Sequence, residues 1–466
     1  MGNFFATPDH EESQSTTTTA PSVDRLTLLA GRIGNKTQVL TQGLRARGLL
    51  APSYEVDGCA DFPIQDLDAE TAEARQEVLA LTKELRDLVL GPREGLKLMA
   101  IDMVNYIPLH AIYIFKIAQA VPSTGSISYE QAATQIHALS GYEIAVSELR
   151  RLLRLAVANN LFCEPQVGHV AHNCSSRVLL KDEALASWIG MFTEDLFLPI
   201  GNTVAAMRKW PGSEEPTETA VNVSYGHQDT FFDHTQSDTA RARRYELSMK
   251  AHGSREGFDV VHTVQGYPWA KLGKGTVVDI GGSQGHVSMA LAEQFPSLSF
   301  QVQDLPGLRS DKTRAHVPAH LAERVSLTTH DFFHEQPIVA DAYLLRHVLH
   351  AFPDKAVVRI LQQLRPALRP GARIIINDAV LPAPGSVSPA EERNSRLLDV
   401  LMKTVCNGRE REASDWRAVL ERADARFVWQ GAWKSSGNLW FVEAVWEGEG
   451  KTNGTNGTNG TNGTHA

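Results

Sequence analysis

The spacing of hydrophobic and polar positions differs between the two halves of the chain. In the second half, segments with a strand pattern alternate with segments of helical spacing. Short β-branched and apolar runs, the pattern of strands buried on both faces, are separated by longer stretches with helical spacing. The predicted strands are residues 277–280, 299–303, 325–328, 342–345, 373–376, 427–430 and 440–446. This alternation predicts an α/β fold with a doubly wound, mostly parallel, seven-stranded Rossmann-like sheet.

The first half of the chain is mainly helical in pattern. Residues 68–90 place Leu81 and Leu88 on one helical face, and the pair Gly91-Pro92 predicts the end of that helix. Further helices are predicted at residues 183–210 and 237–252. A mainly helical region is therefore expected to precede the sheet.

Within that region, residues 96–170 resemble a winged helix. The pattern is helix, a short helix opened by a capping box at residues 128–131, another helix, and then a polar hairpin. Arg150, Arg151 and Arg154 would lie on the exposed side of the recognition-like helix, so DNA binding has to be considered. A solvated basic face on a dimerisation module is the favoured interpretation, because the net charge of the whole chain is −9.

Composition narrows the class of protein. The 466 residues are 42% hydrophobic, and the sequence pI is near 6.0, which argues against nucleic acid as the main partner. Four cysteines without a Cys-x-x-Cys pair fit a reducing compartment. Residues 1–21 carry no apolar core for secretion, and polar side chains interrupt the apolar zone 96–121. We therefore expect a cytoplasmic protein with no membrane span.

A glycine-rich turn follows the first predicted strand, with glycines at 281, 282 and 285. Glycines at this place let the backbone approach a nucleotide-like ligand. The dinucleotide fingerprint would need glycine at Ser283 and His286, no P-loop occurs, and no Lys or Arg lies in the turn to meet a pyrophosphate. A nucleoside without phosphates is the better ligand, and Asp304 at the end of the second strand is placed to bind its ribose hydroxyls.

Polar side chains follow the other predicted strands as well. Asp331 and Phe332 follow the third strand, where they could meet an exocyclic amine and the face of a base. The fourth strand is followed by Arg346, His347 and His350, the fifth by Asp378, and Glu410 comes later in the chain. A histidine at this edge with carboxylates in reach is suited to act as a general base, because its ordinary pKa lies near neutrality.

These residues lie in motifs that resemble a known family. The motifs are Asp279-Ile280-Gly281-Gly282-Ser283-Gln284-Gly285, Asp331-Phe332-Phe333, Leu345-Arg346-His347-Val348-Leu349-His350-Ala351-Phe352-Pro353-Asp354 and Asn407-Gly408-Arg409-Glu410-Arg411. In this order and spacing they are similar to the S-adenosylmethionine-dependent, cation-independent O-methyltransferases of the plant caffeate and flavonoid type. The likeness is greatest to their fungal relatives that act on aromatic polyketides, and it spans residues 96–446.

The resemblance implies roles for individual residues. It assigns the methyl donor, S-adenosylmethionine, to Gly281, Gly282, Gly285, Asp304, Asp331, Phe332 and Arg346. It implies that His350 deprotonates the acceptor hydroxyl and that Asp378 and Glu410 bracket it. It places Tyr245, Met249, His347, Met402 and Asn407 along the acceptor pocket. No metal is implied, and no cluster of His, Asp and Glu with ligand spacing is expected beside the donor site.

The family likeness also gives a domain plan. We expect a disordered segment 1–25, a helical extension 26–95, a winged-helix dimerisation domain 96–222, a methyltransferase domain 223–447 and a flexible Thr-Asn-Gly tail 448–466. Members of the family usually form homodimers through the amino-terminal module. The expected partners are thus a small aromatic acceptor and a second copy, without nucleic acid or membrane.

Three positions depart from the plant pattern: Ser283 replaces a glycine, His347 a common tryptophan, and Ala351 a common aspartate. The changes at 347 and 351 would alter the acceptor pocket without removing the base. Two other functions stay open. One is a non-methylating pericyclase or dehydratase that binds the same sulfonium, and the other is a winged-helix regulator.

Overall fold

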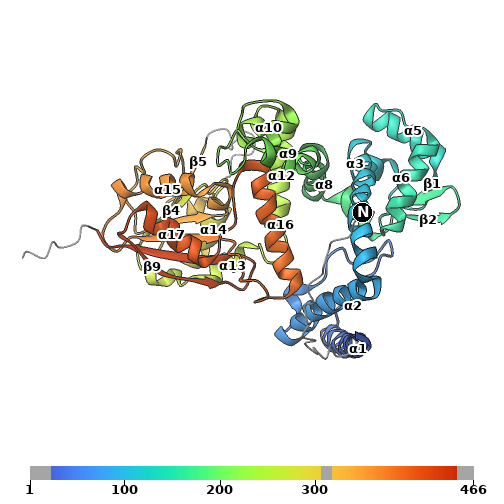
Figure 1. The fold of residues 1–466 in the computed structure, drawn as a ribbon, viewed down its shortest axis with the longest axis horizontal. Helices are drawn as coiled ribbons and strands as arrows, with labels where there is room; N and C mark the ends of the chain where they lie inside the picture. Colours follow the sequence, from blue (N-terminus) through green and yellow to red (C-terminus); the bar gives the residue numbers. More distant parts are fainter. Residues whose placement is uncertain (1–21, 306–316, 449–466) are drawn as a thin grey trace, which may run out of the picture. The chain divides into compact units, whose positions relative to one another are not determined.

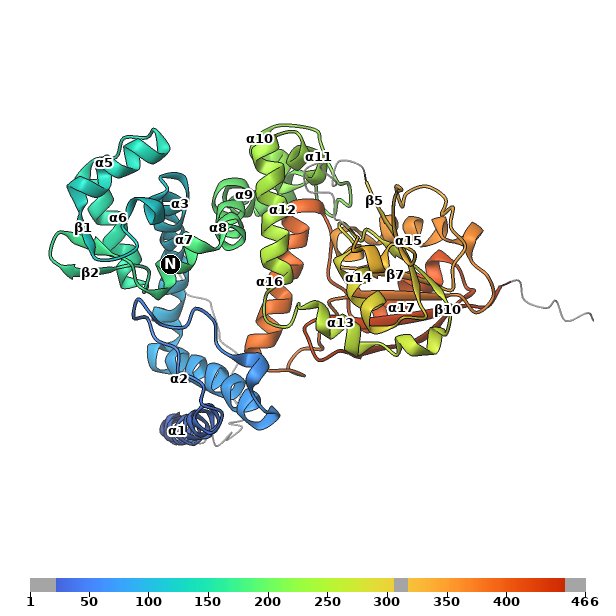
Figure 2. The same cartoon turned by 180° about the vertical axis from the view of Figure 1, so that it is seen from behind.

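The computed structural model describes residues 22–305 and 317–448 (Figures 1 and 2). The chain divides into two compact units, residues 1–104 and 105–466. The predictions of disorder at residues 1–21 and of a flexible tail beyond residue 448 lie outside the described residues. Within the described part, no helix is long and apolar enough to cross a membrane.

The first unit is a helical hairpin. Helices α1 (Ser22–Ala46) and α2 (Ala69–Ile101) pack side by side, with η1 (Ile64–Asp66) between them and η2 (Asp102–Asn105) after them. Ion pairs join the two helices, among them Arg25 to Glu84 and Lys36 to Glu77. Helix α1 begins at Ser22, so the expected disorder of residues 1–25 is wrong for its last four residues.

The prediction that the second helix ends at Gly91-Pro92 is only partly right. Gly91 has φ 72° and ψ 160°, so the helix breaks there, but helical structure resumes and continues to Ile101. Glycine adopts this left-handed φ without a Cβ penalty, and proline is tolerated in the first turn of the segment that follows. The sequence pattern thus marks a kink and not an end.

The second unit opens with the winged helix that the sequence predicts. Its elements are α3 (Tyr106–Ile114), α4 (Ile117–Ala120), β1 (Ser126–Ser128), α5 (Tyr129–Ser140), α6 (Val146–Ala158), β2 (Cys163–Gln166) and β3 (His169–Ala171). The strands form a small antiparallel sheet in the order β1-β3-β2. The capping box of Ser128 and Gln131 opens α5, and Tyr129, Leu149 and Phe162 lie in one buried core with the other apolar side chains.

A helical region connects this module to the large sheet. Its elements are α7 (Cys174–Lys181), α8 (Glu183–Gly190), the π-helical turn η3 (Met191–Asp195), α9 (Phe197–Lys209), α10 (Ala220–Tyr225), α11 (Phe231–Gln236), α12 (Thr239–Gly253), α13 (Val260–Gly266) and η4 (Trp269–Leu272). Helix α12 packs along α8. A π-helical turn inserts one extra residue per turn and often marks a functional place in a helix.

The large sheet has the predicted seven strands, in the order β6-β5-β4-β7-β8-β10-β9. They are β4 (Thr276–Ile280), β5 (Ser299–Asp304), β6 (Val325–Thr329), β7 (Ala342–Arg346), β8 (Arg373–Asp378), β9 (Phe427–Lys434) and β10 (Trp440–Trp446). The first five are parallel, and β10 runs antiparallel to both of its neighbours. Strand β9 runs four residues past the predicted end, across a register shift opposite Glu443 and Ala444.

Helices cover both faces of the sheet (Figures 1 and 2). They are α14 (His286–Gln294), α15 (Asp354–Gln363) and α17 (Ala413–Ala423), with short turns η6 (Ala319–Leu321), η7 (Leu349–Ala351) and η8 (Arg365–Ala367). Helix α16 (Pro389–Cys406) packs instead against α9 and α10. Helices α15 and α17 pack on one core, while α13 and α14 pack on the other. Because strand order reverses at β4, the carboxyl ends of β4, β5 and β7 border the crevice where ligands bind in such sheets.

Candidate active site

The glycine turn after β4 is tightly enclosed. Gly281 and Gly285 have φ of 71° and 76°, in the region where only glycine is unstrained. A Cβ on Gly281 would lie 2.7 Å from Val348 Cγ2, and one on Gly282 would lie 2.6 Å from Asp279 Cγ. Glycine is therefore required at both places by space. The contact with Val348 also brings the turn against the loop that carries the predicted base.

The turn is fixed by the end of β5. The amides of Gly281 and Gly282 donate to the carbonyl of Gln303, at 2.8 and 3.2 Å. Asp304, predicted to bind the donor ribose, is buried, and its carboxylate accepts hydrogen bonds from the amides of Ser283 (2.7 Å) and Leu305 (2.7 Å). The structure thus brings the predicted acid and the glycine turn together at one edge of the sheet.

Asp279 lies in β4, just before the glycine turn. The sequence did not suggest a role for it. It is buried in β4, and its carboxylate accepts a 2.6 Å hydrogen bond from Ser288 Oγ on α14. Burial raises the pKa of Asp279 to about 6. The only sequence signal was its place in the quoted motif, where it reads equally well as a strand residue.

Asp331 and Phe332, which are also predicted to bind the donor, make their contacts with residues near them in the fold. Asp331 accepts a hydrogen bond from the amide of Phe333 (2.9 Å) and lies 3.2 Å from His334 Nδ1, so it holds its own turn. The Phe332 ring packs against Phe333 and Phe352, at centroid distances of 5.2 and 5.6 Å. Both residues follow β6, at the same edge of the sheet as Asp304.

Arg346, also predicted to bind the donor, is engaged within the protein. Its guanidinium donates to Thr263 Oγ1 at 3.0 Å and to the carbonyl of Phe258 at 2.8 Å. Burial lowers the pKa of Arg346, while the nearby carboxylates of Asp279 and Asp378 act in the other direction. These contacts tie the end of β7 to α13 and the segment before it.

The predicted catalytic residues form one buried cluster, which we call the catalytic cluster: His350, Asp378 and Glu410. His350 Nδ1 lies 2.8 Å from Glu410 Oε1, and the His350 amide donates to Asp378 Oδ2 at 3.2 Å. Asp378 Oδ1 and Glu410 Oε2 are buried without a hydrogen-bond partner among the described residues. Burial disfavours the charged imidazole, but the carboxylates of Glu410 and Asp378 outweigh it and raise the pKa of His350 to about 9.

Two further residues build this cluster, and the sequence reasoning missed both. A Cβ on Gly408 would lie 2.4 Å from the carbonyl oxygen of His350, so only glycine lets the two backbones meet. Arg411 is fully buried and donates to the carbonyls of Leu349 (3.2 Å) and Phe352 (2.8 Å), which fixes the loop around the base. Both belong to the quoted motif around Glu410, but nothing in their spacing reveals contacts with residues 349–352.

The residues predicted to line the acceptor pocket come from α12, from the loop after β7 and from the end of α16. Tyr245 on α12 and Met402 on α16 pack around the same apolar cluster, which Ala351 also joins. Burial raises the pKa of Tyr245. Met249 lies one turn further along α12 and is 36% exposed. Asn407 is buried, and its side-chain amide donates to the carbonyls of Glu215 (2.6 Å) and Glu218 (3.1 Å), so the structure uses it to hold that loop.

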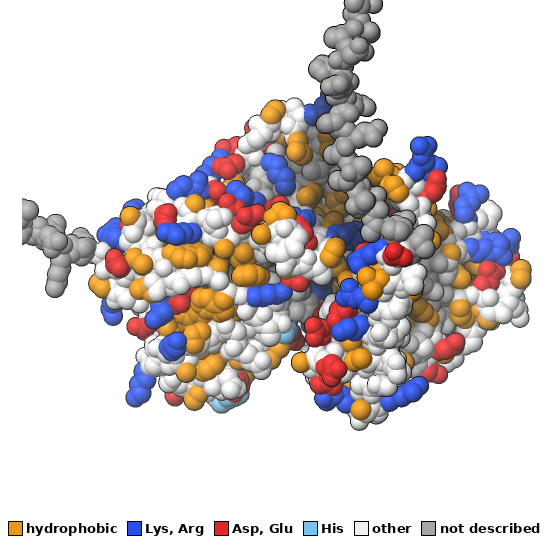
Figure 3. Space-filling model, turned by 60° about the horizontal axis from the view of Figure 1, so that its bottom comes forward, with side chains coloured by type: hydrophobic (Ala, Val, Ile, Leu, Met, Phe, Trp, Pro, Cys, Tyr) orange, Lys and Arg blue, Asp and Glu red, His pale blue; other side chains and the backbone are white. Residues whose placement is uncertain are grey.

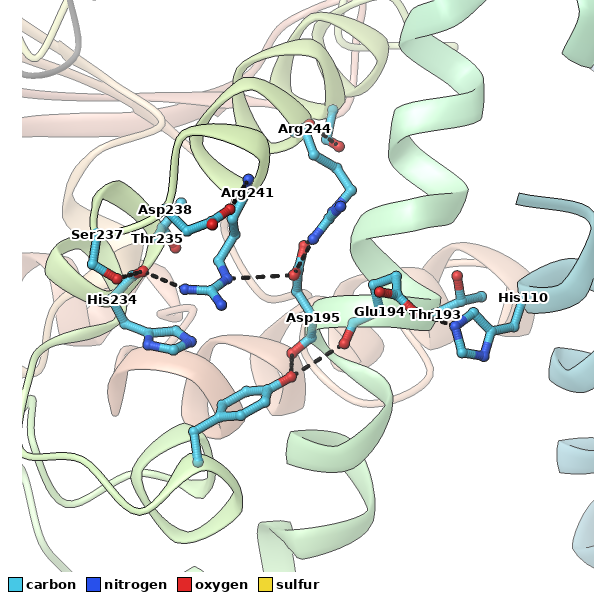
Figure 4. Close-up of polar contacts among 12 residues, drawn as sticks. His110, Thr193, Glu194, Asp195, His234, Thr235, Ser237, Asp238, Arg241 and Arg244 are labelled. Atoms are coloured by element: carbon cyan, nitrogen blue, oxygen red, sulfur yellow. Dashed lines mark hydrogen bonds and ion pairs between the residues drawn. The ribbon is translucent and has the colours of Figure 1, made fainter. Parts of the chain in front are cut away.

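Helix α12 is held in place by a second charged cluster, which we call the arginine clamp: Asp195, Arg241 and Arg244 (Figure 4). Asp195 in η3 receives two hydrogen bonds from Arg244, at 2.6 and 2.7 Å, and lies 3.6 Å from Arg241 Nε. The carbonyls of Glu194 and Asp195 also accept the Tyr225 hydroxyl, at 3.1 and 2.9 Å. Because Tyr245 directly follows Arg244 on α12, the clamp holds the part of the helix that carries this residue.

The sequence shows no cluster with metal-ligand spacing beside the donor site, but the fold brings three possible ligand groups together around His350. One ring nitrogen each of His347 and His350 and a carboxylate oxygen of Asp378 lie within 4.8 Å of one another. Two of these groups are also within hydrogen-bond distance of each other, since His347 Nδ1 lies 3.2 Å from His350 Nε2. The spacing therefore fits a hydrogen-bonded proton-transfer group as well as a ligand set.

A glycine turn without phosphate ligands, a buried acid after β5 and a histidine–carboxylate cluster after β7 define the class of S-adenosylmethionine-dependent methyltransferases with a Rossmann-like sheet. The sequence profile of the O-methyltransferase domain matches residues 212–426. The chain belongs to the O-methyltransferase family.

Individual relatives support this membership. "O-methyltransferase pyvH" from Aspergillus violaceofuscus is 38% identical over 91% of this chain and 99% of its own. "Chlorophenol O-methyltransferase" from Trichoderma longibrachiatum is 35% identical, over 92% of each chain. The crystal structure of OxaC has the same fold, with a TM-score of 0.72 at 20% identity, and covers 91% of this chain and all of its own; a second OxaC structure contains SAH and oxaline.

Proposed function

We propose that this O-methyltransferase transfers the methyl group of S-adenosylmethionine to a phenolic hydroxyl of an aromatic, polyketide-type metabolite. The observation that carries the proposal is the catalytic cluster beside the donor turn, with His350 between two carboxylates. The glycine turn lies against Asp304, the buried acid that we assign to the ribose of the donor, since the Ser283 amide donates to its carboxylate. When bound, the donor supplies an activated methyl group, so the protein has to align the acceptor and remove its proton.

In this proposal His350 is the general base that takes the proton from the acceptor hydroxyl. Nδ1 stays on Glu410, which fixes the ring, and the carboxylates of Asp378 and Glu410 stabilise the imidazolium that forms. General-base assistance of this kind contributes about 10²–10⁴-fold to the rate, and no metal is needed for it. The relative that is named for chlorophenol supports a phenolic acceptor.

The test is His350→Gln, assayed with labelled methyl donor and a panel of phenolic polyketides. We expect methyl transfer to fall at least ~10²-fold while SAH binding, measured by calorimetry, is unchanged. Near wild-type transfer by the variant would overturn the assignment of the base. Products that lack the added methyl mass with the wild-type enzyme would overturn the proposed reaction itself and favour a non-methylating enzyme.

We further propose a homodimer. Several exposed apolar side chains lie on α9 in the second unit, namely Phe197, Leu198, Ile200, Val204 and Met207. The first unit separately exposes Val89, Leu96, Met99 and Ile101 on α2. Figure 3 shows one face of the molecule, where apolar side chains lie among charged ones. Exposed apolar groups in such number are typical of a subunit interface, and analytical ultracentrifugation should give twice the chain mass.

Nucleic acid and membrane are not among the proposed partners, and the proposed location is the cytoplasm. Arg154 pairs with Glu164 at 2.9 Å, and Arg150 lies 5.7 Å from the centre of the Tyr129 ring, so two of the three basic side chains on α6 have partners within the module. The four cysteines are scattered without a Cys-x-x-Cys pair, as in proteins of a reducing compartment. A gel shift with duplex DNA at low salt should show no binding.

A further inference from the structure

An arginine without a counter-charge lies just after α12. The three arginines of α12 itself all pair with acids, two of them with Asp195 in the arginine clamp (Figure 4). Arg255 follows the end of the helix by two residues, and its side chain makes no hydrogen bond or ion pair with any of residues 22–305 and 317–448. Arg255 therefore carries a positive charge that this part of the chain does not neutralise.

Aromatic rings hold the Arg255 side chain in place. Its guanidinium carbon lies 5.7 Å from the centre of the Trp188 ring and 5.4 Å from that of the Phe258 ring. The His252 imidazole lies between the same two rings, at centroid distances of 5.4 Å from Trp188 and 4.7 Å from Phe258. Contact with ring faces positions a guanidinium but leaves its N–H donors free. Arg255 is thus positioned and still able to bind a planar anion.

The rings around Arg255 connect it to the catalytic cluster. The His347 ring lies 5.1 Å from His252 and 5.5 Å from Phe258, and only 4.6 Å from the ring of His350. His347 is one of the residues predicted to line the acceptor pocket. The unpaired charge of Arg255 therefore lies on the acceptor side of the base, separated from it by a short row of rings.

Two histidine nitrogens in this row have no partner. His252 Nδ1 and His347 Nε2 are buried without a hydrogen bond to any described residue. Buried polar atoms are usually hydrogen-bonded, so two such atoms beside an unpaired arginine point to a ligand. Burial lowers the pKa of both rings, to about 3 for His252, and the positive charge of Arg255 acts in the same direction. A ligand here would meet two neutral imidazoles and one permanent positive charge.

We propose that Arg255 determines acceptor specificity by binding a carboxylate on the aromatic acceptor, with the free nitrogens of His252 and His347 beside it. The acceptor is then an aromatic hydroxy acid, with its hydroxyl at His350 and its carboxylate at Arg255. A guanidinium offers a carboxylate two parallel N–H donors, and a neutral imidazole with its proton on the free nitrogen offers another. The inference rests on the proposed function and extends it by naming a second group of the acceptor.

The kinetic test uses acceptors that differ only in this group. The probes are 2,4-dihydroxy-6-methylbenzoic acid and 3-hydroxy-2-naphthoic acid, each with its methyl ester, and the wild-type enzyme should prefer the acids. Arg255→Met keeps an unbranched stem on the rings but removes the charge. Its kcat/KM for the acids should fall at least ~10-fold, mainly through KM, as for the loss of a charge-assisted hydrogen bond. For the esters it should change by less than about 3-fold.

Two further variants control this test. Arg255→Lys keeps the charge without the planar fork and should restore part of the preference for the acids. Arg243→Gln removes an exposed arginine that pairs with Glu183, and it should leave acids and esters unaffected. Equal losses on acids and esters with Arg255→Met would overturn the inference and leave Arg255 a packing residue. A matching loss of SAH affinity would overturn it as well, because Arg255 would then bind the carboxylate of the donor.

Calorimetry separates this inference from the proposed function, because it needs no turnover. The acids should bind to the wild-type enzyme loaded with SAH at least ~10-fold more tightly than to Arg255→Met loaded in the same way. If the wild-type enzyme methylates no phenol but shows this difference, the proposed function fails and the carboxylate site stands. If it methylates phenols and the two proteins bind the acids equally, the proposed function stands and the inference fails.

Discussion

The catalytic cluster and the arginine clamp both bury charged side chains, but their hydrogen bonding differs. In the clamp, each oxygen of Asp195 is paired with Arg244, and both side chains are about 15% exposed or less. In the catalytic cluster one oxygen of Asp378 and one of Glu410 have no partner within the described part of the chain. In the clamp, each oxygen of one carboxylate has an arginine as its partner. In the catalytic cluster, two acids lie around one imidazole.

The difference separates a structural ion pair from a site prepared for reaction. Burial raises the pKa of Asp378, which means that its ionised form is held at a cost. In the clamp, burial opposes the charge on Arg244, but Asp195 outweighs it and raises the pKa of Arg244. Unpaired buried oxygens persist in a folded protein where function requires them. Removing an acid should therefore cost more stability in the clamp than in the catalytic cluster.

The largest expected effect is on the clamp. Asp195→Ala leaves the partly buried Arg241 and Arg244 without their shared counter-charge, so the loss in the free energy of unfolding should lie between the about 1 kcal/mol of an exposed pair and the about 3–5 kcal/mol of a fully buried one. Urea denaturation followed by circular dichroism would measure the loss.

Arg243→Ala is the matched control, because Arg243 lies on the same helix and pairs with Glu183 where both side chains are more than 60% exposed. It should change the free energy of unfolding by less than about 0.5 kcal/mol. If the two variants were equally stable, the clamp would not be a structural ion pair.

The second largest expected effect is a loss of activity. Glu410→Gln removes the carboxylate that holds His350 Nδ1 and should lower kcat by about 10²-fold. Its free energy of unfolding should fall by less than that of Asp195→Ala, because the glutamine still accepts a hydrogen bond from His350 Nδ1 and only the charge that stabilises the imidazolium is lost. Steady-state kinetics and urea denaturation on the same preparation test both parts. A loss of stability as large as that of Asp195→Ala would mean that the two clusters are alike.

A third prediction concerns pH. The pKa of His350 is raised from 6.5 to about 9, so the folded state binds this proton more tightly than the unfolded chain does. The stabilisation is fully present below the unfolded pKa near 6.5 and is lost as the pH rises through about 9. The free energy of unfolding of the wild-type protein should therefore fall across this window relative to that of His350→Gln. Parallel pH curves for the two proteins would show that the pKa of His350 is not raised.

How far the sequence predicts these features depends on whether the contacts are local. The seven strands, the glycine turn and the capping box of Ser128 follow from patterns within a few residues, and each is present. Gly408 and Arg411 act on residues about 60 positions earlier, so their role depends on tertiary contacts that no spacing encodes. The same holds for Asp195, which meets Arg244 only after 49 residues.

The smallest expected effect lies in the donor turn. Ser283 has φ 50°, a left-handed conformation that costs an L-residue about 1–2 kcal/mol, and it stands where the plant pattern has glycine. Ser283→Gly removes this cost but adds flexibility to the unfolded chain, so the net gain in the free energy of unfolding should be under about 1 kcal/mol. The Ser283 amide that donates to Asp304 is kept in the variant, and calorimetry should therefore show unchanged affinity for SAH. A variant less stable than the wild type would mean that the serine side chain itself stabilises the turn.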